Sequence, residues 1–271
     1  MTEQALGNRA VLCSVDWRGV VTVSLNRPEL NNAYNGEMLA GLNAAMDLVQ
    51  AQPSARVVVL RGNGRHFQAG ADLSWVAGVA SQGTEANLAA SRLTAQVVQR
   101  LNMLHVPTVA LVHRGCFGGG TGLVASCDVA IASEDATFAI TEARWGLMAG
   151  IILPHLFQAI GARDLRRYAL TCERFDAHEA KRIGLVHQVC PPGELDAYGE
   201  KIVDELLMNA PEAVALTKRR ALALSGGELS DGLMNDLIAE HAARRQSAEA
   251  AEGTAAFLQK RRPAWYPGST E

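Results

Sequence analysis

The chain has 271 residues, of which 48% are hydrophobic and 20% charged, so it can fold around a sizeable core. Its 25 basic and 28 acidic residues give a net charge of −3, which excludes a nucleic-acid binder that depends on a basic surface. An apolar leader segment and a run of about 20 apolar residues are both absent from the sequence, so we expect a cytoplasmic protein without a membrane partner.

The first half of the chain predicts strands that alternate with helices. Alternating apolar and polar residues indicate a β-hairpin, a 3.6-residue apolar spacing indicates helices, and short apolar runs indicate buried strands. In chain order these are a hairpin over 11–25, a helix over 37–50, a strand over 56–61, a helix over 84–104, and strands over 108–112 and 128–132. This alternation favours an α/β layer architecture.

From about residue 164 the pattern is almost entirely helical. The predicted helices cover 196–207, 211–224 and 230–259. Because they lack the apolar density for a core of their own, we expect them to pack on the rest of the chain or on another subunit. We therefore divide the chain into a core domain, 1–195, and a C-terminal helical subdomain, 196–271.

The five cysteines and seven histidines do not form a metal-binding pattern. No two cysteines are close enough for a Cys-x-x-Cys pair, and the histidines have neither the His-Glu-x-x-His nor the His-x-His spacing. A reduced compartment, free thiols and no metal ion are therefore expected.

Three short segments carry residues suited to chemistry, and the first is 66–73. Its Gly70 lies among small residues, where a strand has ended and a helix is about to begin. Small side chains let a ligand approach the backbone, and an amide N–H at such a point is free to donate a hydrogen bond. The alternative is a tight turn without function.

The second segment, 115–122, reads Gly-Cys-Phe-Gly-Gly-Gly-Thr-Gly and lies between a strand and a helix. Consecutive glycines are entropically costly, and bare backbone at a helix start attracts the negative charge of a phosphate or a developing oxyanion. Residues 120–125 also match Gly-x-Gly-x-x-Ala, so a dinucleotide-binding loop is an alternative, although such loops usually lie in the first strand–helix unit. A second alternative is that the glycines serve only to let the helix pack closely on the sheet.

The third segment, 138–147, contains Glu142, a single carboxylate between apolar residues. Partial burial would raise its pKa and suit it to act as a general acid or base. The structural alternative is a helix cap or an ion pair with Arg144 or Arg163.

Together with other motifs, these segments resemble the enoyl-CoA hydratase/isomerase family, also called the crotonase family. The motifs occur in family order and at family spacing over nearly the whole chain. They are Asn-Arg-Pro at 26–28 with Asn-Ala at 32–33, Phe-Gln-Ala-Gly-Ala-Asp at 67–72, Pro107 and Ala110 ahead of 115–120, Cys-Asp at 127–128, Phe138 ahead of Glu142, and Ala-Phe-Leu-Gln-Lys-Arg-Arg-Pro at 256–263.

The resemblance implies a crotonase-like spiral of ββα units followed by a helical trimerisation subdomain, in a homotrimer or a dimer of trimers. It implies an acyl-CoA thioester substrate, with coenzyme A as part of the substrate and no separate cofactor. By position, the backbone N–H groups of Ala71 and Gly119 form an oxyanion hole that stabilises an enolate. The candidate residues for substrate and coenzyme A binding are Arg27, Ala69, Gly70, Asp72, Gly118, Gly122, Arg144 and Lys260, with Arg27 and Lys260 as candidates for phosphate contacts.

The chain departs from the family pattern at Gly122. Family hydratases carry a glutamate there and a second one at the position of Glu142. With one glutamate left, three activities stay open: hydration by Glu142 alone, proton transfer between carbons as in an isomerase, and acyl-CoA binding without catalysis.

We favour hydration, because the segments 118–128 and 140–147 are most similar to bacterial methylglutaconyl-CoA hydratases of leucine degradation. A glycine often replaces the first glutamate in that subgroup. If the substrate carries a second carboxylate, Arg144 is a candidate partner for it.

Overall fold

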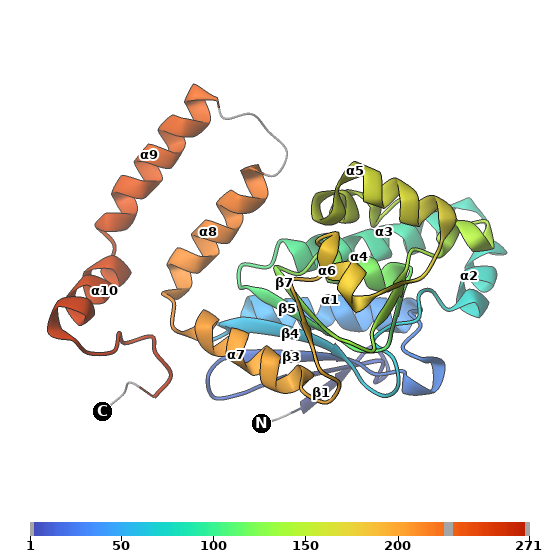
Figure 1. The fold of residues 1–271 in the computed structure, drawn as a ribbon, viewed down its shortest axis with the longest axis horizontal. Helices are drawn as coiled ribbons and strands as arrows, with labels where there is room; N and C mark the ends of the chain where they lie inside the picture. The colour runs from blue at the N-terminus through green and yellow to red at the C-terminus, as the bar shows by residue number, and fades with distance from the viewer. Residues whose placement is uncertain (1–2, 225–229, 269–271) are drawn as a thin grey trace.

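A seven-stranded sheet forms the centre of the computed structural model, which describes residues 3–224 and 230–268 (Figure 1). Its strands lie side by side in the order β1 (Glu3–Leu6), β2 (Val11–Val15), β3 (Val20–Leu25), β4 (Val57–Gly62), β5 (Thr108–Val112), β7 (Val129–Ser133) and β10 (Gln188–Cys190). The first three strands pair antiparallel, and β3 to β10 run parallel. Parallel strands need helical cover on both faces, which explains their nearly continuous apolar sequence.

Helices cover both faces of this sheet. One face packs against α1 (Gly36–Ala51), α3 (Thr84–Asn102), α4 (Gly119–Ala125) and α5 (Leu153–Thr171), and the other packs against α7 (Leu195–Leu207). Side chains of β4 alternate between the two, since Val58 and Leu60 belong to the larger core while Val57 and Val59 contact the α7 side. The sheet is therefore buried from both sides.

A second, three-stranded sheet stands beside the first. It consists of β6 (Gly115–Phe117), β8 (Thr137–Ala139) and β9 (Phe175–Asp176), in which β6 and β8 are parallel and β9 is antiparallel to β8. Phe138 and Phe175 stack across it with ring centroids 5.7 Å apart. The remaining elements are η1 (Pro28–Leu30), α2 (Leu73–Ala80), η2 (Glu142–Trp145), α6 (Ala177–Arg182), α8 (Pro211–Leu224), α9 (Asp231–Arg245) and α10 (Ala248–Gln259).

The predicted α/β architecture is confirmed, with a central sheet and a helical C-terminal region. Two details were wrong. The chain after residue 164 is not purely helical, because it contains β9 and β10, and strands of two and three residues are too short to produce a periodic pattern. The helix predicted over 230–259 is two helices, since the Ser247 side chain accepts a hydrogen bond from the Ala250 N–H and starts α10.

The helices α8, α9 and α10 stand away from the sheet (Figure 1). Lys218 of α8 forms an ion pair with Asp128 at 2.7 Å and thereby ties α8 to the start of β7. Phe257 of α10 is 82% exposed, so a large apolar side chain is uncovered on this arm. The domain division at residue 195 and the trimer stay predictions. No helix in the described part of the chain has the length and apolarity to cross a membrane.

Candidate active site

A short parallel ladder brings the three predicted segments side by side. Gln68 pairs with Cys116, and Cys116 pairs in turn with Phe138. Because the three segments run in the same direction, the residues that follow each of them emerge at the same end of the ladder. That end collects Gly70, Ala71, Gly118, Gly119 and Glu142.

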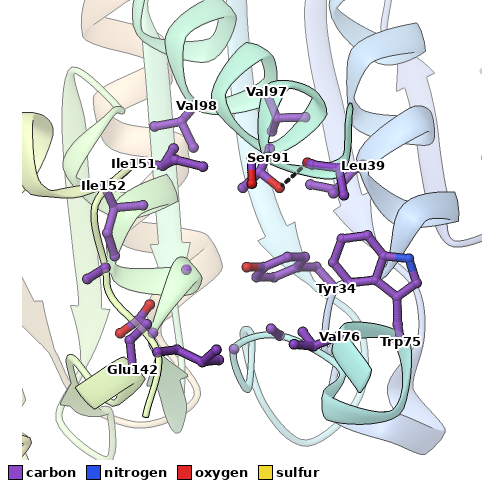
Figure 2. A pocket seen from close by; sticks show the side chains of 18 of the residues that line it. Tyr34, Leu39, Trp75, Val76, Ser91, Val97, Val98, Glu142, Ile151 and Ile152 are labelled. Atoms are coloured by element: carbon purple, nitrogen blue, oxygen red, sulfur yellow. Dashed lines mark hydrogen bonds between the residues drawn. The ribbon is translucent and has the colours of Figure 1, made fainter. Parts of the chain in front are cut away.

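These residues line a cavity of about 440 Å³ (Figure 2). Its other walls come from α1, α2, α3, α4 and the segment 145–152. Among the described residues that line it, Glu142 is the one carboxylate, and lysine, arginine and histidine are absent. An apolar cavity with a few converging polar groups is the usual form of a small-molecule site. The aliphatic lining residues are Leu39, Leu42, Leu73, Val76, Val79, Val97, Val98, Leu123, Leu147, Ile151 and Ile152.

Two backbone N–H groups at the end of the ladder, those of Ala71 and Gly119, have no acceptor within residues 3–224 and 230–268. Tyr34 accounts for the first: its N–H donates to the Gly70 carbonyl and its carbonyl accepts from the Asp72 N–H, both at 2.9 Å. This parallel bridge leaves the intervening Ala71 N–H unused. Gly119 is the first residue of α4, where N–H groups lack partners inside the helix. Two free donors beside one cavity can hold a negatively charged oxygen.

The glycines at 118 and 119 are explained by what approaches them. A Cβ atom on Gly118 would lie 3.0 Å from Oε1 of Glu142, and Gly118 has a φ of +50°, in the left-handed region. A Cβ atom on Gly119 would lie 2.7 Å from Cε1 of Tyr34. Bare backbone at these positions therefore lets the carboxylate and the phenol ring come close to the free N–H groups.

Glu142 is the first residue of η2, and its side chain points into the cavity (Figure 2). Its Oε2 is buried and has no hydrogen-bond partner in the described part of the chain. Burial raises the pKa of Glu142, although hydrogen bonds from the backbone of Glu142 and Thr141 act in the opposite direction. A carboxyl group with a raised pKa and one unengaged oxygen is suited to take up and return a proton.

The alternative role for Glu142, an ion pair with Arg144 or Arg163, is wrong for the described residues. The guanidinium of Arg144 instead donates to the Cys172 carbonyl at 2.9 Å, and Arg144 does not line the cavity. The structure thus does not bring Arg144 to the position that contact with a substrate carboxylate would require.

Arg27 and Asp72 also lie outside the cavity lining, and they contact each other. Their side chains form a partly buried ion pair at 3.1 Å. Asp72 in addition accepts hydrogen bonds from the N–H groups of Ser74 and Trp75, so it caps α2. This arrangement stabilises the turn that carries Ala71.

Lys260 is separated from the cavity in this chain. It ends α10 in the left-handed conformation, on the arm that stands away from the sheet (Figure 1). Its contact with a phosphate of coenzyme A stays a prediction.

Gly122 lies on α4, where a side chain would have no room. A Cβ atom there would lie 2.2 Å from Cγ2 and 2.6 Å from Cβ of Ile152. Ile152 itself lines the cavity. Hydrocarbon therefore fills the space that a carboxylate at position 122 would need.

Sequence reasoning assigned no role to Tyr34 and Gln68. Tyr34 lines the cavity opposite Glu142 (Figure 2). Gln68 is fully buried, and its amide accepts from the Gly70 N–H at 2.8 Å and donates to the Gly70 carbonyl at 3.1 Å, which fixes the turn before Ala71. The available signal was polarity: Gln68 is a polar residue inside the quoted motif at 67–72, and Tyr34 directly follows the quoted Asn-Ala at 32–33.

All five cysteines are buried free thiols, and the described residues contain no group of three His, Cys, Asp or Glu side chains suited to a metal ion. The absence of a separate cofactor stays a prediction.

Comparison with known proteins matches this arrangement to one family. A family model described as enoyl-CoA hydratase/isomerase matches residues 17–267. The 2,3-dehydroadipyl-CoA hydratase of Escherichia coli is 31% identical, over 90% of this chain and 94% of that protein. The solved structure of Pseudomonas aeruginosa AtuE is 38% identical with a TM-score of 0.90, over 94% of this chain and 99% of that one. A solved enoyl-CoA hydratase from Shewanella pealeana is 33% identical with a TM-score of 0.90, over 94% of this chain and 96% of that one.

Proposed function

The chain belongs to the enoyl-CoA hydratase/isomerase family, and on that basis we propose that it adds water across C2=C3 of a branched 2-enoyl-CoA. One observation carries the proposal: two free backbone N–H groups, of Ala71 and Gly119, and the carboxylate of Glu142 converge on one apolar cavity. Hydration requires such a pairing, because negative charge develops on the thioester oxygen while a proton moves between water and C2.

In the proposed reaction the thioester oxygen accepts hydrogen bonds from the Ala71 and Gly119 N–H groups. Glu142 takes a proton from water as the water oxygen bonds to C3, and the C2=C3 electron pair moves toward the thioester oxygen to form the enolate. The protonated Glu142 then donates its proton to C2 as the carbonyl re-forms. One water is added, and Glu142 returns to its charged form. Loss of one oxyanion donor typically lowers such rates by about 10²–10³-fold.

The residues that line the cavity indicate which kind of acyl group the site accepts. Its aliphatic side chains suit a branched hydrocarbon, whereas a second carboxylate would find no cation among the described lining residues. Arg144, the sequence-based candidate for that partner, is directed to the Cys172 carbonyl. We therefore favour an uncharged branched acyl group over methylglutaconyl, the acyl group that the sequence pattern favours.

A panel of enoyl-CoA thioesters tests the proposal. Crotonyl-, 3-methylcrotonyl- and methylglutaconyl-CoA are incubated with the enzyme, loss of the conjugated double bond is followed by ultraviolet absorbance, and mass spectrometry separates addition of water from a shift of the double bond. We expect hydration, fastest with 3-methylcrotonyl-CoA. Glu142→Gln is the control, and hydration at an unchanged rate in that variant would contradict the proposal.

Isomerisation is the second candidate, because Glu142 is the one carboxylate among the described lining residues and one group suffices to move a proton between carbons. A 3-enoyl-CoA added to the panel would reveal isomerisation, because its product would have unchanged mass and a conjugated double bond. Binding without turnover would instead indicate a non-catalytic acyl-CoA-binding protein. A homotrimer or dimer of trimers and a cytoplasmic location remain part of the prediction.

A further inference from the structure

Hydration by one glutamate leaves open what holds the nucleophilic water on its other side. Glu142 can accept one hydrogen from that water, and a second contact is needed to aim the oxygen at C3. The neighbouring wall offers none at position 122, since Ile152 fills that space with methyl groups. A polar group elsewhere on the wall must therefore supply the contact.

Tyr34 has the position for it. Figure 2 shows its hydroxyl reaching into the cavity from the wall opposite Glu142. No hydrogen-bond partner for this hydroxyl occurs among the residues that the structure describes. Burial, together with the charge of Glu142, raises the pKa of Tyr34 to about 12, so the phenol keeps its proton at neutral pH and can donate.

The phenol ring is also held firmly. The Tyr34 backbone brackets Ala71 with two hydrogen bonds of 2.9 Å to its neighbours. The ring meets Trp75 edge-on, with centroids 5.9 Å apart and an interplanar angle of 65°, and lies against the bare backbone of Gly119. The hydroxyl is thus fixed relative to both free N–H groups, as a group that aims a reactant must be.

We propose that the Tyr34 hydroxyl is a further catalytic group, which binds the nucleophilic water and holds it between itself and Glu142. It neither gains nor loses a proton over the reaction. Glu142 alone transfers the proton from water to C2, and Tyr34 fixes the water's position. This inference rests on the proposed hydratase activity and adds the second contact that one glutamate cannot supply.

The test compares two reactions in the variant Tyr34→Phe, which removes the hydroxyl and keeps the ring. The first is hydration of the best enoyl-CoA of the panel. The second is exchange of the C2 protons of a saturated acyl-CoA in D₂O, which needs the N–H pair and Glu142 but no water at C3. Tyr198→Phe, on α7 and outside the cavity lining, is the matched control for loss of a phenol oxygen.

We expect Tyr34→Phe to lower kcat for hydration by about 10–100-fold, as for loss of one hydrogen bond to a developing charge, with little change in KM. Exchange at C2 should stay within about three-fold of the unchanged enzyme, because enolate formation does not use this water. Tyr198→Phe should leave both rates unchanged.

Two results would overturn the inference while leaving the hydratase proposal intact. Unchanged hydration in Tyr34→Phe would mean that the hydroxyl does not hold the water. Equal losses of hydration and exchange would mean that Tyr34 acts on the enolate or on the fold. If the unchanged enzyme hydrates no member of the panel, the hydratase proposal fails, and the inference fails with it.

Discussion

Replacing Gly122 by alanine should destabilise the protein, although alanine is the better helix former. In an open helix this change stabilises by about 0.5–1 kcal/mol. At position 122 the new Cβ would lie 2.2 Å from Cγ2 of Ile152, which is itself buried at 4% exposure and cannot move aside freely. Overpacking of this kind costs about 1–3 kcal/mol, so we expect a net loss of about 1 kcal/mol in the free energy of unfolding.

Urea unfolding, followed by circular dichroism at one protein concentration, measures this change. The matched control is Gly78→Ala on α2, where an added Cβ would meet nothing within 4 Å. That control should raise the unfolding midpoint, so the two glycine-to-alanine changes should have opposite signs.

A double-mutant cycle with Ile152→Ala identifies the cause. Ile152→Ala by itself removes buried hydrocarbon and should cost about 2–5 kcal/mol. In the double variant the new methyl group at 122 occupies part of the space vacated, so the combined loss should be smaller than the sum by at least about 1 kcal/mol. Additive losses, or a Gly122→Ala protein as stable as Gly78→Ala, would refute the packing argument.

Three further predictions concern the cavity. Since burial raises the pKa of Glu142, kcat/KM should fall with decreasing pH through an acid limb above the ordinary glutamate pKa of 4.5. Glu142→Gln should lower the rate by about 10²–10⁴-fold and abolish that limb. An acid limb at or below pH 4.5 would contradict the raised pKa of Glu142. Gly118→Ala, at a φ of +50° and 3.0 Å from Oε1 of Glu142, should lower kcat at least about 10-fold, measured in the hydration assay. Arg144→Met should leave the ratio of kcat/KM for methylglutaconyl- and 3-methylcrotonyl-CoA unchanged, and a selective loss on the diacid would restore a substrate contact for Arg144.

The segments that form the candidate site were predictable as far as local pattern reaches. The glycines at 118 and 119 and the small residues around Gly70 mark backbone that must stay bare, and Glu142 is marked by its apolar surroundings. These features depend on residue type and short spacing, which the sequence states directly. Strands as short as β9 leave no such pattern, so they could not be predicted.

The sequence by itself determined the α/β class, the family, and the three segments that surround the cavity, because these follow from periodicity and from motifs in a fixed order. Only the tertiary structure decided what each side chain meets. The ladder through Gln68, Cys116 and Phe138 joins segments far apart in the chain. Ile152 occupies the space beside Gly122, and Arg144 turns to a backbone carbonyl. Such contacts depend on long-range packing, which local sequence does not encode, and they leave Glu142 and Tyr34 facing each other across an apolar cavity.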